Sequence, residues 1–262
     1  MNKLVIVGCG WLADIVADAV INGLLPEYDL VGVYSRTAAK ADRLAFKMEQ
    51  NGKPCKACRS LDELLALKPA YLVEAASPAG MKEITLPTLK NGTSIVTLSI
   101  GALADNEFYE QVKLTAKENG SRVYIASGAT GGFDVLRTAT LMGNASARFF
   151  NEKGVRALRR SRFYDPAMEN EKRIVFSGTA REAINTFPTG LNVSVAASLA
   201  SVGPEEMQVT MQSSPNFVGD TQRVEIKNDE VHAVVEVYSA TSAIAGWSVV
   251  STLINITSPI VF

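Results

Sequence analysis

Short apolar runs alternate with helically spaced apolar positions along the first half of the chain. The apolar runs cover residues 3–7, 28–35, 70–77, 93–100 and 122–127. Helical spacing covers residues 11–22, 37–50, 60–68, 78–89 and 105–119, with Thr37 and Ser60 as candidate N-caps. Brief apolar runs bounded by turns are typical of strands buried on both faces. The alternation of strand and helix therefore predicts an α/β fold built on a parallel, doubly wound sheet.

The rhythm changes after the sequence SGATGG at residues 127–132. Strand-like patterns follow at 147–160, 172–177, 205–213, 221–227 and 231–238, and helical patterns at 179–187 and 191–203. This half predicts an α+β unit in which helices cover a mixed or antiparallel sheet. We expect a first domain over 1–127, a second over 128–239, and a closing helix within 240–262 that returns to the first domain.

The composition is that of an ordinary globular protein, and it argues against several classes of partner. Hydrophobic residues make up 47% of the chain, and 26 basic residues nearly balance 27 acidic ones. A net charge of −1 without a polybasic run gives no reason to expect nucleic acid or a membrane surface as a partner. No apolar run approaches the roughly 20 residues that a membrane-spanning helix needs. Three cysteines cannot all pair, so we expect a cytoplasmic protein.

The first strand turns on Gly8-Cys9-Gly10 and continues as a helix through Trp11 and Leu12. In a dinucleotide-binding turn the first glycine makes the bend and the second lets the backbone approach a pyrophosphate. The third position needs only a small residue, here Ala13. The helix N-terminus adds free N–H groups for the phosphates. Two glycines can also serve a purely steric role. With strand and helix both predicted, we expect a Rossmann dinucleotide-binding domain.

The end of the second strand discriminates between NAD and NADP. NAD-selective sites place an Asp or Glu there, which accepts hydrogen bonds from the ribose hydroxyls. This chain has Ser35-Arg36-Thr37 instead. Arg36 can pair with a 2′-phosphate while Ser35 and Thr37 donate hydrogen bonds to it, although a solvated loop arginine would look the same. The sequence therefore favours NADP as the cofactor and leaves NAD as the alternative.

Further candidate ligand contacts follow the next two strands of the predicted sheet. Open α/β sheets bind ligands at the carboxyl ends of their strands. The candidates at this edge are Glu74, Ala76, Ser77, Ser99 and Gly101.

Other chemical motifs are weak in this sequence. Cys55 and Cys58 form a lone CxxC without further zinc ligands nearby, so two loop cysteines are the simpler interpretation and we predict no metal site. Neither a G-x-S-x-G elbow nor a P-loop lysine motif occurs. The sole histidine, His232, lies in the alternating run EVHAVVEVY, where a solvated or hydrogen-bonded strand position is the default interpretation.

Five segments spread over nearly the whole chain carry a family resemblance. They are EAASPAG, SIGALAD, IASGATGGFDVL, FSGTAREAINTFPTGLNVSVAASLA and ATSAIAGWSVVSTL. In this order they resemble L-aspartate dehydrogenases, and the SxGALAD and SGAxGGxD patterns are specific. The resemblance implies a Rossmann domain followed by an α+β substrate and dimerisation domain, usually in a homodimer. It also implies NAD(P)-linked oxidation of L-aspartate to iminoaspartate, a precursor for NAD synthesis.

The resemblance also assigns roles to individual positions. It implies cofactor contacts at Ala129 and Asn192. The family's catalytic histidine follows that asparagine by about thirty residues, and the matching position here, 222 − 192 = 30, is Gln222. The family's later NPKTS reads YSATS at 238–242, without its lysine. Because an amide does not titrate near neutral pH, the cofactor half matches the family whereas the acid/base half does not.

Three hypotheses follow from this departure. The first is oxidation of aspartate, with water or His232 replacing the missing base. The second is an NADP-dependent dehydrogenase of another small amino or oxo acid. The third is a catalytically silent protein that binds the cofactor as a sensor or regulator.

Overall fold

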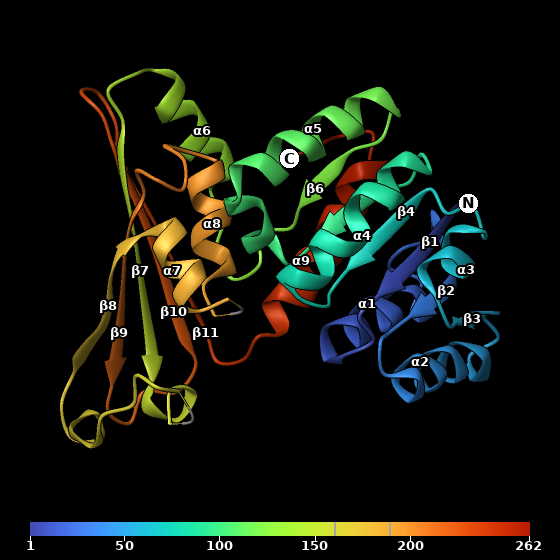
Figure 1. Cartoon of the computed structure of the whole chain (residues 1–262), viewed down its shortest axis with the longest axis horizontal. Helices are drawn as coiled ribbons and strands as arrows, with labels where there is room; N and C mark the ends of the chain where they lie inside the picture. The colour runs from blue at the N-terminus through green and yellow to red at the C-terminus, as the bar shows by residue number, and fades with distance from the viewer. Residues whose placement is uncertain (160, 189) are drawn as a thin grey trace. The chain divides into compact units, whose positions relative to one another are not determined.

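A computed structural model of the chain describes residues 1–159, 161–188 and 190–262. The chain divides into two compact units, which are described separately (Figure 1). The first unit comprises Met1–Gly128 together with Ala245–Phe262, and the second comprises Ala129–Ile244. No helix in the described ranges is long and apolar enough to cross a bilayer. The last residue of the strand expected at 147–160, Arg160, lies outside the described residues.

The first unit is built on a parallel sheet with the strand order β3-β2-β1-β4-β5-β6. Its strands are β1 (Asn2–Val7), β2 (Tyr28–Tyr34), β3 (Lys56–Cys58), β4 (Tyr71–Glu74), β5 (Ser94–Thr97) and β6 (Val123–Ile125). The order reverses between β1 and β4, and at such a switch point the neighbouring connections leave in opposite directions, which opens a crevice at the carboxyl edge. The predicted Rossmann architecture is confirmed.

Helices connect these strands. They are α1 (Trp11–Ile21), α2 (Ala38–Gln50), α3 (Leu61–Leu65), α4 (Pro78–Lys90) and α5 (Asn106–Glu118). The predicted cap Ser60 accepts a hydrogen bond from Glu63 N at 3.1 Å, whereas Thr37 occupies the N-cap position of α2 without a side-chain capping bond. The expected strand at 93–100 ends at Thr97, and Ile100–Ala104 forms a 3₁₀ helix, η1.

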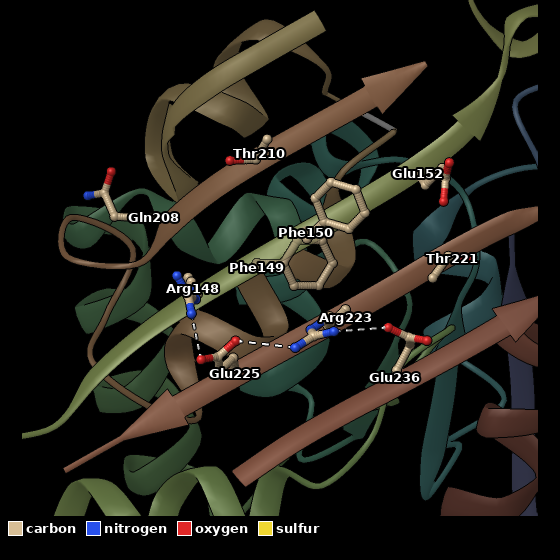
Figure 2. A pocket seen from close by; sticks show the side chains of 10 residues that line it. All are labelled: Arg148, Phe149, Phe150, Glu152, Gln208, Thr210, Thr221, Arg223, Glu225 and Glu236. Atoms are coloured by element: carbon tan, nitrogen blue, oxygen red, sulfur yellow. Dashed lines mark hydrogen bonds and ion pairs between the residues drawn. The ribbon is translucent and has the colours of Figure 1, made fainter. Parts of the chain in front are cut away.

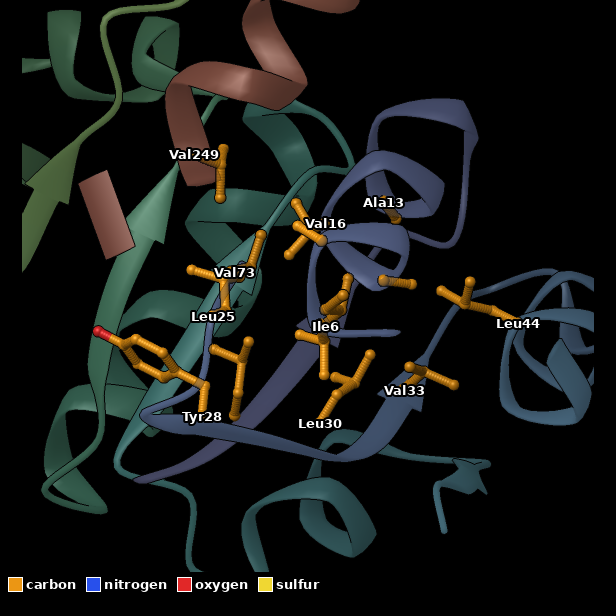
Figure 3. Packing of buried hydrophobic residues seen from close by; sticks show 14 of the residues in the cluster. Ile6, Ala13, Val16, Leu25, Tyr28, Leu30, Val33, Leu44, Val73 and Val249 are labelled. Carbon is orange, nitrogen blue, oxygen red and sulfur yellow. The ribbon is translucent and has the colours of Figure 1, made fainter. Parts of the chain in front are cut away.

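The core of the first unit joins both ends of the chain (Figure 3). Ile6, Val33 and Val73, from three neighbouring strands, are fully buried, and Val249 of α9 (Ala243–Thr257) packs in the same cluster. The Tyr28 hydroxyl donates a hydrogen bond of 2.7 Å to Leu253 O on this closing helix. The helix is therefore integral to the first unit.

The interpretation of Cys55 and Cys58 as loop cysteines holds for Cys55, which directly precedes β3, and is wrong for Cys58. Cys58 ends the short strand β3, and both side chains are buried. Burial raises the pKa of Cys55 to about 12. Both residues pack as small apolar side chains.

The second unit contains a mixed sheet with the order β11-β10-β7-β9-β8. Its strands are β7 (Ser146–Gly154), β8 (Arg173–Thr179), β9 (Gln208–Ser214), β10 (Asp220–Lys227) and β11 (His232–Ser239). The pairing of β7 with β9 is parallel, and the other pairings are antiparallel. The expected α+β class is confirmed, but β7 ends at Gly154, before the 3₁₀ helix η2 (Val155–Ala157).

Helices cover one face of this second sheet (Figure 1). They are α6 (Phe133–Leu141), α7 (Ala180–Thr186) and α8 (Asn192–Leu199), accompanied by the 3₁₀ helix η3 (Pro166–Glu169). The apolar pattern had not predicted α6. Phe149, Val209 and Val224 are buried on the helix-covered face, because alternate strand residues point to the same side.

The opposite face of this sheet carries a charged network (Figure 2). Glu225 accepts from Arg148 at 2.6 Å, lies 2.9 Å from His232 Nε2, and lies 3.5 Å from Arg223, which reaches Glu236 at 3.6 Å. The hydrogen bond from Arg148 lowers the pKa of Glu225 to about 2, burial opposes this, and the hydrogen bond from His232 adds to it. The carboxylate is thus held ionised far into the acid range.

We predict that Arg148→Gln lowers stability in a pH-dependent way. Glu225 has a lower pKa folded than unfolded, so its interaction with Arg148 contributes above about pH 4.5 and is lost as the pH falls through about 2. Urea unfolding should therefore give a lower free energy of unfolding for the variant than for wild type at pH 7. This difference in free energy should shrink as the pH falls towards 2. Arg137→Gln, on α6, is the control, because no ion pair links Arg137 to another described residue. A difference independent of pH would contradict the prediction.

Candidate functional site

The turn after β1 fits against the end of β4. Gly8 has φ +94°, in the region that favours glycine, and a Cβ added there would lie 2.5 Å from Ala75 O and 2.7 Å from Ala76 N. Gly8 N also donates to Tyr34 O at 2.9 Å, which ties the turn to β2. Only glycine lets these three backbone segments approach so closely.

Gly10 serves a different purpose from Gly8. It is the N-cap residue of α1 and has φ −89°. Because it is a glycine, it has no side chain that could cap the helix. A Cβ added to Gly10 would meet nothing within 4 Å, and the residue lines a cavity. The position is sterically undemanding for the fold, so its lack of a side chain leaves open space beside the first N–H groups of α1.

Arg43, on α2, stabilises the Gly8–Gly10 turn through hydrogen bonds. Its guanidinium makes two hydrogen bonds to the Asp14 carboxylate, at 2.8 and 2.9 Å, and one to Cys9 O at 3.2 Å. Burial raises the pKa of the Cys9 thiol to about 12, although Arg43 opposes the shift. The thiol therefore stays protonated and donates to Tyr34 O at 3.5 Å. Arg43 was missed because only the folded contact between α1 and α2 reveals its role.

The carboxyl edge of the first sheet forms a cavity of about 450 Å³. This volume lies in the range of small-molecule sites. The cavity is lined by Val7, Gly8, Cys9, Gly10, Tyr34, Ser35, Arg36, Thr37, Lys40, Ser60, Leu61, Ala75, Ala76, Gly80, Glu83 and Ile84. The structure thus brings together seven of the expected cofactor contacts, whereas Trp11, Leu12, Ser77, Ser99 and Gly101 lie outside this lining.

Two cations line the cavity beside the end of β2. Arg36 was expected there, and Lys40, from the first turn of α2, joins it. Ser35 Oγ accepts a hydrogen bond from Thr37 N at 3.3 Å, which shapes the loop between them. A lysine four residues after the arginine, at the start of a predicted helix, was the sequence signal for Lys40. Because Arg36 and Lys40 are both cations, this part of the cavity suits an anion with several oxygens.

The expected contacts Ser77 and Ser99 have local structural partners. Ser77 caps α4 by accepting a hydrogen bond from Gly80 N at 3.1 Å, while Ser99 Oγ donates to Glu74 at 2.8 Å. Both serines therefore shape loops at the carboxyl edge rather than lining the cavity directly.

The second unit carries a polar cluster at one end of its helix-covered sheet face. We call it the strand-end cluster, and it consists of Asn151, Lys153, Ser213, Asp220 and Gln222. Gln222 pairs in register with Asn151, Asp220 with Lys153, and Lys153 with Ser213, so the five side chains share one face. Among the described strand residues on this face, Asp220 is the only carboxylate.

Hydrogen bonding in the strand-end cluster is incomplete. Lys153 Nζ lies 3.0 Å from Asp220 Oδ2 and donates to Gly190 O at 3.3 Å, while Asn151 Nδ2 donates to Asp220 Oδ1 and Thr221 O. Asn151 Oδ1, Ser213 Oγ and Gln222 Oε1 are buried and have no hydrogen-bond partner among the residues that the structure describes. Buried polar atoms are normally paired, so the cluster is poised to accept hydrogen bonds from a bound molecule or water.

Lys153 also lines a cavity of about 520 Å³. Arg162 belongs to the same lining and lies 4.8 Å from the centroid of the Phe163 ring. Phe163 in turn packs on Phe187 with ring centroids 4.6 Å apart. The cavity therefore combines two cations with an aromatic wall, which suits a small anionic molecule.

The two expected catalytic residues do not share a site. Gln222 is 3% exposed on the helix-covered face, whereas His232 is hydrogen-bonded to Glu225 on the opposite, open face. Register explains the separation, because Gln222 pairs with Val237 while His232 pairs with Lys227. Ala129 and Asn192 belong to the second unit, Asn192 as the first residue of α8, and neither lines the cavity of the first unit.

Two family models match the chain, one in each half. The model described as "Homoserine dehydrogenase, NAD binding domain" matches residues 8–126, and the model described as "Aspartate dehydrogenase, C-terminal" matches residues 134–256.

Curated relatives and a solved structure match over almost the full length. L-Aspartate dehydrogenase of Methanococcus maripaludis is 30% identical, with 99% of this chain and 98% of the relative covered. The enzyme of that name from Methanocaldococcus jannaschii is 32% identical with the same coverage. The crystal structure of aspartate dehydrogenase from Thermotoga maritima has a TM-score of 0.77 at 26% identity and covers 100% of this chain and 99% of that one. A hyperthermophilic archaeal homoserine dehydrogenase in complex with NADPH shares the fold, with a TM-score of 0.64 at 14% identity.

The two glycines of the turn should respond differently to alanine. Gly8→Ala should lower the free energy of unfolding by about 1–3 kcal/mol, because the new Cβ meets the Ala75 carbonyl at a positive φ. Gly10→Ala should leave stability nearly unchanged and weaken dinucleotide binding, because its Cβ projects into open space. Urea unfolding and fluorescence titration with NADPH measure the two effects. Equal stability losses in the two variants would refute the assignment.

Proposed function

Because the chain belongs to the L-aspartate dehydrogenase family, we propose that it oxidises L-aspartate to iminoaspartate with NADP. The observation that carries the proposal is the glycine-lined cavity, whose lining residues, apart from Val7, all lie within the residues matched by the NAD-binding model. The residues around Gly8 and Gly10 would hold the dinucleotide, which would supply the acceptor for the hydride of the substrate α-carbon. The amine loses a proton as its C–N bond becomes C=N, and hydrolysis of the imine gives oxaloacetate and ammonia.

The residues of the first unit fit a dinucleotide. Gly8 leaves no room for a side chain and Gly10 leaves open space at the N-terminus of α1, the arrangement that suits a pyrophosphate. Arg36 and Lys40 supply two positive charges where an NAD-selective site has a carboxylate. These charges support NADP over NAD, and NAD remains the alternative cofactor.

The second unit offers groups for the substrate and its protons. Lys153 and Arg162 line one cavity, and a dicarboxylate needs cations. Gln222 does not titrate near neutral pH, and His232 lies on the opposite face. Asp220 shares the face of Gln222, two residues before it, and is paired with Lys153. In the proposed mechanism Asp220 moves the amine or water proton, and Lys153 orients the Asp220 carboxylate.

A second substrate class has a specific observation in its favour. The Asp220 carboxylate, 3.0 Å from Lys153, neutralises one of the two cations of the cavity. This pairing favours an amino or oxo acid with a single carboxylate. If Asp220 takes no part in proton transfer, the buried amide of Gln222 supports a silent NADP-binding sensor instead.

The proposal extends to the compartment, the oligomeric state and the metabolic role of the protein. The free, buried thiols of Cys9, Cys55 and Cys58 suit a reducing compartment, so we place the protein in the cytoplasm. The family resemblance supports a homodimer and a role in NAD synthesis. Sedimentation analysis of the purified protein would test the dimer.

Assays with L-aspartate and with oxaloacetate plus ammonia, each with NADP and NAD, test the function directly. A panel of monocarboxylic amino and oxo acids should be run in parallel. NADP-linked turnover of aspartate supports the main proposal, and turnover of monocarboxylic acids alone supports the second class. Tight NADPH binding without turnover of any substrate would support the silent NADP-binding sensor. Binding of neither cofactor would reject all three proposed functions.

Arg36→Ala and Lys40→Ala should each weaken NADPH binding about tenfold or more and change NADH binding little. The reason is the loss of a charge-assisted contact to the 2′-phosphate. Fluorescence titration gives the two dissociation constants. Lys117→Ala is the control, because Lys117 is an exposed lysine in the last turn of α5 and does not line the cavity. Equal losses for both cofactors would contradict the assignment of these cations to the phosphate.

Asp220→Asn should lower kcat by about 100-fold or more and leave the NADPH dissociation constant unchanged. Asparagine keeps the shape and can still accept from Lys153, but it no longer accepts a proton near neutral pH. Steady-state kinetics across pH and NADPH titration separate the two quantities. His232→Ala should leave kcat unchanged, because that ring lies on the other face of the sheet. An active Asp220→Asn enzyme would remove Asp220 from the mechanism.

A further inference from the structure

Glu74 is a completely buried carboxyl group at the carboxyl end of the central strand β4. It accepts five hydrogen bonds. Its Oε1 accepts from Ala76 N at 2.8 Å, Ser77 N at 3.2 Å and Ser99 Oγ at 2.8 Å. Its Oε2 accepts from Thr97 Oγ1 at 2.7 Å and Ser99 N at 3.1 Å. A carboxyl group is rarely buried completely unless hydrogen bonds or an opposite charge compensate for the loss of water.

Four of these five donors come from two loops that follow neighbouring strands, and the fifth, Thr97 Oγ1, comes from the last residue of β5. Ala76 and Ser77 connect β4 to α4, while Ser99 follows β5 and precedes η1. Glu74 thus fastens the loop after its own strand to the loop after the next one, at the sheet edge that forms the cavity.

The first of these loops is a wall of the cavity. Ala75 and Ala76 line it, and their peptide packs into the space left by the absent side chain of Gly8. Any shift of Ala76 therefore changes the wall and its fit to the glycine turn together. The carboxyl group itself does not line the cavity, so its influence on a ligand passes through this peptide.

The donor pattern requires two acceptor oxygens. Each oxygen of Glu74 faces at least one backbone N–H, Ala76 and Ser77 on one side and Ser99 on the other, and a backbone N–H cannot reverse its role. An amide in place of the carboxyl group would oppose N–H to N–H in either orientation. Burial raises the pKa of Glu74, while the hydrogen bonds from Thr97, Ala76 and Ser99 oppose the rise.

We propose that Glu74 is a positioning residue of the dinucleotide site, which holds the Ala75–Ala76 wall against the Gly8 turn in the shape that accepts the cofactor. This role rests on the proposed dinucleotide function and extends it to a residue that does not touch the cavity. Glu74 acts through Ala76 and Ser99, so its loss should move ligand affinity separately from overall stability.

The test compares Glu74→Gln with a matched buried variant, Thr93→Val. Thr93 is also fully buried and donates to Pro69 O at 2.8 Å, but it precedes β5 at the amino edge of the same sheet. Both variants should lower the midpoint of urea unfolding. Glu74→Gln should weaken NADPH binding about tenfold or more, whereas Thr93→Val should stay within about twofold of wild type.

Ser99→Ala provides a milder variant in case Glu74→Gln does not fold. It removes the Ser99 hydroxyl bond to Oε1 and keeps the backbone bond to Oε2, so affinity for NADPH should fall about threefold. Hydrogen exchange at the amide of Ala76 should be faster in Ser99→Ala and unchanged in Thr93→Val.

The outcomes separate this inference from the proposed function. Wild type that binds neither NADPH nor NADH would reject the function. Wild type that binds NADPH while Glu74→Gln and Ser99→Ala bind it equally well would reject only the role of Glu74. Equal losses of NADPH affinity in Glu74→Gln and Thr93→Val would reject the positioning role. They would show that Glu74 affects binding only through overall stability.

Discussion

The backbone of Ala75 and Ala76 lies where a side chain on Gly8 would be, and the cavity of the first unit depends on this contact. It joins the ends of β1 and β4, the two strands between which the order of the sheet reverses. Ala75 N donates to Val7 O at 2.9 Å, so the two strands remain paired up to the turn. Arg43 braces the turn on one side and Glu74 holds the opposing peptide on the other. The opening of the cavity follows from these restraints.

The second unit shows how one sheet separates two kinds of polar chemistry. On the open face, Arg148, Arg223 and His232 gather around Glu225, which is thereby satisfied. On the helix-covered face, three buried polar atoms of the strand-end cluster have no hydrogen-bond partner within the described part of the chain. Among the described residues of this sheet, the buried polar atoms without partners lie on the helix-covered face, so that face is the better candidate for binding a substrate.

Much of the first unit was predictable because its strands are buried on both faces and therefore read as continuous apolar runs. Short elements were not. The strand β3 spans only Lys56–Cys58, and α6 follows Gly132, whose left-handed backbone a sequence pattern does not reveal. Within the site, the glycine turn and Arg36 were visible because their spacing is local. Arg43 and the opposite faces of Gln222 and His232 depend on helix packing and strand register, which no local pattern specifies.

The closing helix α9 has a consequence for the order in which the protein assembles. Tyr28 and Leu253 are 225 positions apart, yet their hydrogen bond lies within the first unit. The second unit is thus an insertion, and its whole sequence leaves the ribosome before the first unit receives its last helix. Val249, Val250 and Leu253 complete a core whose other members were translated much earlier. The apolar surface that these residues cover in the folded first unit is therefore exposed until the insertion has been synthesised.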